Sequence, residues 1–311
     1  MMRSLSVLIP VYNKDCSLQV KRLCHLAGSL TMRGIDVEIV VMEDGSTHEV
    51  SLRSNAEACA ASPLCRHIIN KENVGIARVK NRLIRAAGNE WLLFQDTGLH
   101  VSSDDFFKKY VSALEECPGA QVVCGGICNE KPDFCSLRYR YETATASRRS
   151  VEARRKDPYA SMLLSCILLH RSVAEHIPVD ERFVTYGYED VMYGRRLREE
   201  HVKVLHIDNP VTDTIDEDNE AYVRKTEQAM HTLYLFRKEL KNEVRLLQMM
   251  EKLRRWVPLA AISGFYRLFG GVIRRNLAGS APWWRLFNVY KMAYYADVVR
   301  KSTETEKRNA F

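Results

Sequence analysis

The sequence lacks three features, and each absence argues against a class of protein. No apolar run reaches the ~18 residues that a membrane-spanning helix needs, and the apolar stretch near the N-terminus is too short for a signal peptide. The nine cysteines are an odd number and form no C-x-x-C pair, which argues against a disulfide framework. We therefore expect a cytoplasmic protein whose thiols are reduced.

Acidic residues are also scarce, but only in the last part of the chain. The formal net charge is +7, and residues 251–311 alone hold 12 Lys or Arg against 4 Asp or Glu, a net charge of +8. The rest of the chain is therefore close to neutral. The basic character belongs to residues 251–311 and needs an explanation in that segment. A chain of 311 residues that is 46% hydrophobic can form one large domain, with or without an appendage.

Predicted strands and helices alternate through the first 127 residues. The strands are apolar throughout, as in a mostly parallel sheet that is covered by helices on both faces. The fold class expected is therefore α/β. Strands are expected at residues 6–12, 37–44, 66–70, 90–96 and 120–127, and helices at 17–31, 48–61, 75–87 and 103–116.

Polar residues end three of these strands: Tyr12-Asn13, Asp44 and Asp96. Ligands of such sheets bind outside the carboxyl ends of the strands. The sequence therefore predicts a ligand site at this edge.

The order changes after residue 127. Residues 129–160 are polar and predict a loop-rich insertion, which is followed by a strand at 162–170, a turn and helix at 185–200, and a late strand at 202–213. Apolar residues at three- and four-residue steps then predict one long helix over 219–256. His206, within an apolar strand, is expected to be structural. We expect a catalytic domain at 1–218 and a helical extension at 219–311.

Four motifs occur in order: "SVLIPVYNK", "EIVVMEDGST", "NVGIARVKNRLIRAAGNEWLLFQD" and "YGYEDVMYGRRL". Together they resemble the family 2 glycosyltransferases with the GT-A nucleotide-sugar fold, over roughly residues 4–230. The resemblance implies an enzyme of class EC 2.4 that transfers a sugar, with inversion, from a nucleotide-diphosphate donor to a hydroxyl acceptor.

The resemblance implies roles in donor binding for residues of the first three motifs. Asp44 would accept the imide N–H of uracil, with Gly45 letting the backbone approach the base, although Asp44 could instead cap the next helix. Pro10 and Tyr12 would form the floor under the base, or simply pack at the strand end. Lys80 stands where the family usually has arginine, and it or Arg78 would face the phosphates or remain an exposed helix charge. The expected donor site comprises Pro10, Tyr12, Asn13, Asp44, Gly45, Ser46, Asn73, Gly75, Arg78, Lys80, Asn81, Asp96 and Thr97.

Glu189 and Asp190 follow a glycine turn and open a predicted helix. Inverting transfer needs a base that takes the proton of the acceptor hydroxyl. The resemblance assigns this role to Asp190, with Glu189 orienting the acceptor. Alternatively, both acids only complement the helix dipole. The enzyme assignment requires positions 44, 96 and 190 to converge on one sugar nucleotide.

The family's Asp-x-Asp motif is altered here, because Gly98 replaces its second acid. Relatives often place a metal-binding histidine where this chain has Asp213. We expect a rebuilt site for Mn²⁺ or Mg²⁺ made of Asp96, Asp213 and His100, since these ions accept oxygen ligands. The competing expectation is weak or absent metal dependence.

The basic C-terminal stretch over 253–275 has an expected apolar side made of Ile262, Phe265, Tyr266, Phe269 and Ile273. Aromatic and basic residues on one amphipathic stretch suit a lipid headgroup interface. We expect residues 251–311 to rest on the inner face of the cytoplasmic membrane and to bring the site to a glycan or lipid-linked acceptor. A helical pair that packs on the catalytic domain or a second subunit is the alternative, and nucleic-acid binding is not expected.

By family analogy, the expected setting is surface-polysaccharide or lipid-linked glycan assembly. The alternative function is a non-catalytic nucleotide-sugar-binding protein with a degenerate metal site. A nucleotidyltransferase fits less well, because no glycine-rich loop with Lys or Arg follows the first strand.

Overall fold

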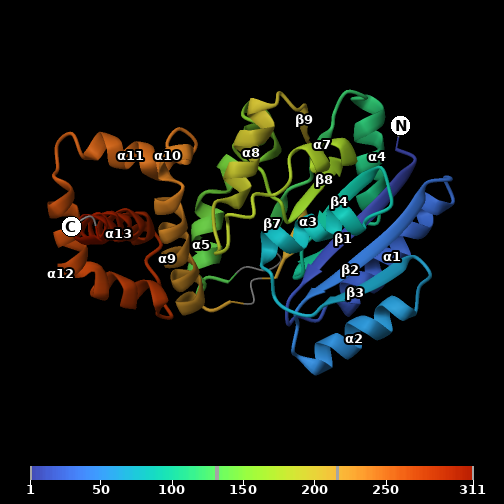
Figure 1. The fold of residues 1–311 in the computed structure, drawn as a ribbon, viewed down its shortest axis with the longest axis horizontal. Coiled ribbons are helices and arrows are strands. Elements are labelled where there is room, and N and C mark those ends of the chain that lie inside the picture. Colours follow the sequence, from blue (N-terminus) through green and yellow to red (C-terminus); the bar gives the residue numbers. More distant parts are fainter. Residues whose placement is uncertain (1, 130–132, 215–216, 310–311) are drawn as a thin grey trace. The chain divides into compact units, whose positions relative to one another are not determined.

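A computed structural model describes residues 2–129, 133–214 and 217–309 (Figure 1). The chain divides into two compact units. The first, called here the sheet unit, comprises Met1–Glu130, Arg149–Val184 and Tyr193–Thr214. The second, the helical unit, comprises Lys131–Arg148, Thr185–Met192 and Ile215–Phe311.

The sheet unit is built on a seven-stranded sheet with the order β3-β2-β1-β4-β8-β6-β9. Every neighbouring pair is parallel except those of β8, which runs antiparallel to β4 and β6. The prediction of a mostly parallel sheet is therefore confirmed. The strands are β1 (Ser4–Val11), β2 (Asp36–Asp44), β3 (Cys65–Asn70), β4 (Trp91–Gln95), β6 (Val122–Cys124), β8 (Cys166–His170) and β9 (Val204–His206). A small second sheet joins β5 (Leu99–His100), β10 (Val211–Asp213) and β7 (Ile127–Asn129).

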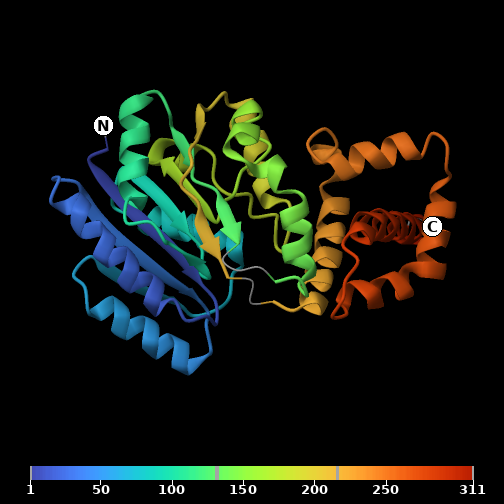
Figure 2. The same cartoon turned by 180° about the vertical axis from the view of Figure 1, so that it is seen from behind.

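Helices cover both faces of the large sheet (Figures 1 and 2). Successive strand residues point to opposite faces, so Val7 and Ile9 belong to one apolar cluster while Leu8 belongs to the other. The first cluster is closed by α1 (Ser17–Thr31), α2 (Glu49–Ala60) and α4 (Phe106–Glu116). The second is closed by α3 (Ile76–Ala86), α7 (Arg171–His176) and the later turns of α8 (Glu189–Glu199).

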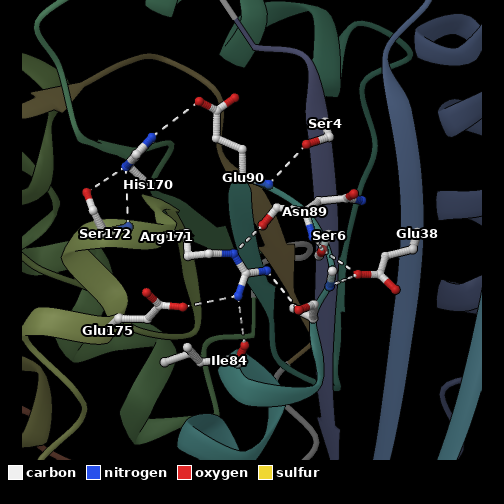
Figure 3. A network of polar contacts seen from close by, with 12 residues as sticks. Ser4, Ser6, Glu38, Ile84, Asn89, Glu90, His170, Arg171, Ser172 and Glu175 are labelled. Carbon is white, nitrogen blue, oxygen red and sulfur yellow. Dashed lines mark hydrogen bonds and ion pairs between the residues drawn. The ribbon is translucent and has the colours of Figure 1, made fainter.

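A polar network fixes the edge of the sheet at the amino ends of β1 and β4 (Figure 3). The Glu38 carboxylate accepts hydrogen bonds from Ser6 Oγ at 2.6 Å and from the Gly88 N–H at 2.5 Å. Arg171 donates to the carbonyl oxygens of Ala87 and Asn89, each at 2.8 Å. The charged side chains of Glu38 and Arg171 therefore fix the backbone of the loop between α3 and β4 (Figure 3).

The described part of the insertion, residues 133–160, is more helical than the expected loop-rich segment. It contains α5 (Leu137–Ala144), a 3₁₀ turn (Ala146–Arg149) and α6 (Val151–Lys156). Ser136 and Ser150 cap the two helices by accepting from the Tyr139 and Ala153 N–H groups. The short helices lack a long apolar period, so the capping serines were the only signal for them in the sequence.

Arg154 of α6 is buried, and its guanidinium makes five hydrogen bonds. It donates to the carbonyl oxygens of Arg149, Cys124, Gly125 and Ile207 at 3.1–3.2 Å, and to His206 Nδ1 at 3.0 Å. His206 Nε2 in turn donates to the Pro158 carbonyl at 2.8 Å. This pattern requires a neutral imidazole with its proton on Nε2, and it confirms that His206 is structural.

The helical unit contains five helices beyond residue 217 among its described residues: α9 (Asn219–Leu235), α10 (Arg237–Leu240), α11 (Arg245–Leu253), α12 (Leu259–Ala278) and α13 (Arg285–Asn309). The single long helix expected over 219–256 was wrong. Phe236, Leu240 and Val244 are all buried at four-residue steps, so the apolar period continues through both breaks and gave no sign of them.

The buried residues of helix α12 are Ile262, Ser263, Gly270, Ile273 and Leu277. Ser263 and Gly270, which are not part of the expected apolar side, are among them. Ser263 Oγ bonds Asp297 Oδ1 of α13 at 2.8 Å, a contact that a small residue permits. Phe265 and Phe269, which the sequence places on the apolar side, are 39% and 51% exposed. None of the described helices is both long and apolar enough to cross a membrane.

The first prediction concerns pH and His206. Burial and the nearby Arg154 and Arg155 charges hold the pKa of His206 below its ordinary value of 6.5, although the bond to Pro158 opposes this. The unfolded chain therefore binds a proton that the folded chain excludes, so stability is full above about pH 6.5 and falls as pH drops below it. Chemical denaturation across this range should show a smaller pH slope for His206→Gln than for wild type. The exposed His176→Gln should keep the wild-type slope, and equal slopes in all three proteins would contradict the assignment.

Candidate functional site

The polar ends of three strands lie at one edge of the large sheet (Figure 1). β1 lies between β2 and β4 and is parallel to both, with Val11 opposite Glu43 and Leu8 opposite Phe94. Tyr12, Asp44 and Asp96 therefore come from adjacent strands and leave the sheet on the same side. The sequence prediction that strands β1, β2 and β4 bring these three residues to a common edge is confirmed by this register.

The first turn of the site is held by side chains expected to bind the donor. Asn13 adopts a left-handed conformation with φ 52°, and its Oδ1 accepts from the N–H groups of Thr47 and His48 at 2.6 and 3.0 Å. Its own N–H donates to Ser46 Oγ at 2.9 Å. Asn13 and Ser46 thus tie the β1 turn to the β2 turn. Tyr12 is left 52% exposed at the edge, while Pro10 is buried in β1.

Asp44 locks the second turn to the start of α3. Its Oδ1 accepts from the Val74 N–H and its Oδ2 from the Gly75 N–H, both at 3.0 Å. Asp44 does not cap α2, where His48 accepts from the Ser51 N–H. Gly45 has φ +68°, and a Cβ at this position would lie 2.3 Å from the Asn73 backbone nitrogen. Only glycine therefore allows the two turns to meet.

The three polar residues expected on α3 have different surroundings. Asn81 is buried, and its amide bonds the backbone of Val179 twice at 2.9 Å, so it has a structural use. Arg78 is exposed and lies 3.6 Å from Glu181. Lys80 is buried, and its Nζ donates to Asp96 Oδ1 at 2.7 Å and to the Leu164 carbonyl at 2.6 Å. The alternative of an exposed helix charge is therefore wrong for Lys80.

Asp96 begins the turn between β4 and β5, in which Thr97 is half-buried. The Asp96 N–H donates to the Ser165 carbonyl at 2.9 Å, and its own carbonyl accepts from Gln19 Nε2 at 3.1 Å. Gly98 follows with φ +90°, a conformation that an aspartate with its side chain rarely adopts.

Glu189 and Asp190 are the first residues of α8 and belong to the helical unit. Gly187, with φ +112°, donates its N–H to Glu189 Oε2 at 2.9 Å. A Cβ at Gly187 would lie 2.6 Å from the Ala229 Cβ of α9, so glycine lets this turn pack against the helix. Both acids are half-buried. Because Asp44 and Asp96 belong to the other unit, the convergence of all three carboxylates stays a prediction.

The comparisons with known proteins agree with this architecture. The family model described as glycosyl transferase family 2 matches residues 6–177. The chain belongs to glycosyl transferase family 2. The fold is that of the GT-A glycosyltransferases, and the chain is a glycosyltransferase.

Two solved structures illustrate the fold of this glycosyltransferase. A mannosyltransferase from Pyrobaculum calidifontis, in complex with GDP-mannose and Mn²⁺, has 14% identity and a TM-score of 0.58, with 96% of this chain and 87% of that chain covered. Glucosyl-3-phosphoglycerate synthase from Mycobacterium tuberculosis, in complex with Mn²⁺, UDP and phosphoglyceric acid, has 15% identity and a TM-score of 0.51, covering 74% and 77%. No match was found among curated protein sequences.

Those two structures hold Mn²⁺, so the residues of this glycosyltransferase can be tested for a metal site. In the β5–β10 pair, His100 lies opposite Thr212 and Asp213 lies opposite Leu99. Because strand side chains alternate, His100 and Asp213 point to opposite faces. Among the residues that the structure describes, no three His, Cys, Asp or Glu gather as metal ligands would. The expected set of Asp96, Asp213 and His100 is therefore not brought together.

Sequence reasoning missed two residues of this glycosyltransferase. Burial raises the pKa of the Glu43 carboxyl, but hydrogen bonds from His67, Ser46 and Asn55 outweigh it and hold the pKa below its usual range. Glu43 therefore anchors the β2 turn as a carboxylate; its signal was the acid pair before Gly45. Lys14, directly after the first motif's Tyr-Asn pair, is exposed, and its Nζ would lie 3.6 Å from a Cβ built at Gly98.

The second prediction tests the Asp44 lock. In Asp44→Asn, one carboxylate oxygen becomes an NH₂ group, which cannot accept the backbone N–H that Asp44 now satisfies. The free energy of unfolding should fall by about 1–3 kcal/mol, measured by urea denaturation. Asp36→Asn, an exposed change at the other end of the same strand, should stay within about 0.5 kcal/mol of wild type. Equal losses in both variants would mean that the lock contributes nothing.

Proposed function

We propose that this glycosyltransferase transfers a sugar from a nucleotide-diphosphate donor, with UDP as the nucleotide, to a hydroxyl acceptor with inversion at the anomeric carbon. The observation that carries the proposal is the shared sheet edge of Tyr12, Asp44 and Asp96. Ligands of open α/β sheets bind at this edge, and the family binds its donors there.

The base of the donor is proposed to bind beside Tyr12 and Asp44. The Tyr12 ring is exposed and offers a flat surface on which a base can stack. The Asp44 carboxylate has about four acceptor positions, of which the Val74 and Gly75 N–H groups take two and Asn70 Nδ2, at 3.4 Å, a weak third. One acceptor position remains for the imide N–H of uracil. A donor assay with UDP-sugars and GDP-sugars side by side tests this choice.

The chemical step is assigned to Asp190. Its carboxylate takes the proton of the acceptor hydroxyl, the hydroxyl oxygen bonds to the anomeric carbon, and the bond from that carbon to the diphosphate oxygen breaks with its electron pair on the leaving group. Glu189 orients the acceptor. The Glu189 carboxylate also binds the Gly187 N–H, so the turn that carries Asp190 is fixed by its neighbour.

The third prediction tests this base. Asp190→Asn should lower turnover by about 10²–10⁴-fold, because the amide cannot take a proton, while the affinity for the donor should stay within about threefold. Release of the nucleoside diphosphate measures turnover, and calorimetry measures affinity. Asp36→Asn serves as the matched control. Unchanged turnover in Asp190→Asn would remove Asp190 from the chemistry, and donor binding without turnover in wild type across a wide acceptor panel would favour a non-catalytic binder.

The acceptor is proposed to be glycan or lipid-linked and to be met at a membrane surface, through residues 251–311. In α12, Phe265, Leu268, Phe269 and Val272 fall at three- and four-residue steps and are 39–76% exposed. Trp256, just before this helix, is 87% exposed. An apolar stripe within a segment of net charge +8, residues 251–311, suits an anionic lipid surface. The exposed basic residues near the stripe are Arg254, Arg255, Arg267 and Arg275.

The fourth prediction tests this surface by liposome co-sedimentation. Wild type should sediment with anionic phosphatidylglycerol vesicles and less with neutral phosphatidylcholine. The double variant Leu268→Gln with Val272→Gln should reduce partitioning about 10-fold or more, because two apolar side chains no longer enter the lipid. A control with the exposed Leu18 and Val50 of the sheet unit changed to Gln should bind as wild type does. Equal binding of both double variants would defeat the membrane proposal.

A further inference from the structure

The one carboxylate that remains of the Asp-x-Asp motif already has a cation. Lys80 Nζ lies 2.7 Å from Asp96 Oδ1 and 5.0 Å from the centre of the Phe94 ring. The Lys80 side chain is 3% exposed and that of Asp96 is 25% exposed. The ammonium therefore lies beneath the carboxylate, on the protein side, and Asp96 shows only its outer part to a ligand.

The position of the lost second acid also faces a cation. At Gly98 the backbone has φ +90°, and a Cβ built there would be 3.6 Å from Lys14 Nζ. The backbone of Lys14 is fixed, because its carbonyl accepts from Asn55 Nδ2 at 2.9 Å, while its side chain is exposed. A positive charge thus lies beside the place where the family's second carboxylate would hold a metal ion.

We propose that the two lysines replace the divalent cation in this glycosyltransferase. The Lys14 ammonium binds the diphosphate of the donor, and Lys80 is a positioning residue that neutralises Asp96 and holds it in place. The donor is then bound, and its sugar transferred, without a divalent metal ion. This inference rests on the proposed function, because it concerns the same nucleotide-diphosphate donor.

The charges support this assignment. The diphosphate oxygen that leaves the anomeric carbon gains negative charge as the bond breaks, and an ammonium offers up to three N–H donors to it. A divalent ion held by Asp96 would share that carboxylate with Lys80 and would lie close to Lys14, so it would meet two like charges at short range. His100 and Asp213, the nearest expected substitutes, point to opposite faces of their strand pair.

The test measures nucleotide binding by the full-length protein, by calorimetry in EDTA and in excess Mn²⁺, with UDP, GDP and the matching nucleosides as probes. The preferred diphosphate should bind with affinities within about threefold in the two conditions. Lys14→Met should weaken diphosphate binding about 10–100-fold, the loss expected for a charge-assisted hydrogen bond. The same variant should leave nucleoside binding unchanged, because a nucleoside has no phosphate. Lys21→Met, an exposed lysine of α1, is the matched control.

A second measurement covers Lys80, whose burial makes a substitution risky for folding. The paramagnetic resonance signal of free Mn²⁺ in the presence of the diphosphate should fall no further when wild type is added, because the diphosphate alone already binds part of the Mn²⁺. Lys80→Met, checked for a folded state by circular dichroism, should bind Mn²⁺ through the released Asp96, and the double variant with Asp96→Asn should not.

The outcomes separate the two proposals. Diphosphate binding that is lost in EDTA and restored by Mn²⁺ would overturn the lysine assignment and leave the proposed function intact. Equal diphosphate binding by wild type and Lys14→Met would also overturn it. Absence of binding by either diphosphate in both conditions would overturn the proposed function and this inference with it.

Discussion

The carboxylate of Asp44 is the contact on which the rest of the candidate site depends. It accepts the Val74 and Gly75 N–H groups and so joins the end of β2 to the start of α3. A buried carboxylate would be costly without such donors, and the positive end of a helix is a favourable place for it. Once the start of α3 is fixed, the direction of the helix fixes where Lys80 lies, and Lys80 reaches Asp96 at the end of β4.

Two glycines make this arrangement possible for steric reasons. At Gly45 any side chain would collide with the Asn73 backbone, so the β2 turn could not approach α3 and Asp44 would lose its donors. Gly98 carries a backbone conformation that disfavours the aspartate of the family motif. The replacement of that acid by glycine therefore goes together with a changed backbone conformation and with the two nearby lysines, Lys14 and Lys80.

The sequence predicted the parts of the structure that follow from period and position. Strand and helix alternation gave the sheet, and the rule about strand ends placed Asp44 and Asp96 at one edge. Prediction from the sequence failed where one residue pattern is compatible with two different structures, such as one long helix or several short ones. Phe236, Leu240 and Val244 keep a helical period across two breaks. Ser263 is buried and bonds Asp297 of α13, a contact that a small polar residue permits. The sequence left Lys80 open between a phosphate-facing and an exposed charge, because lysines are rarely buried unless paired and its partner Asp96 lies 16 residues away in the chain.

The choice of lysine at position 80 also has a physical reason. An arginine there would place a planar group with five donors beside Asp96, and the available acceptors are one carboxylate oxygen and the Leu164 carbonyl. A compact ammonium with three donors matches these two acceptors with fewer unsatisfied N–H groups. The ammonium also lies 5.0 Å from the centre of the Phe94 ring, a distance at which a cation is attracted to the face of an aromatic ring. The lysine at position 80 thus places its positive charge between α3 and β4, beside the one acid that the altered motif keeps.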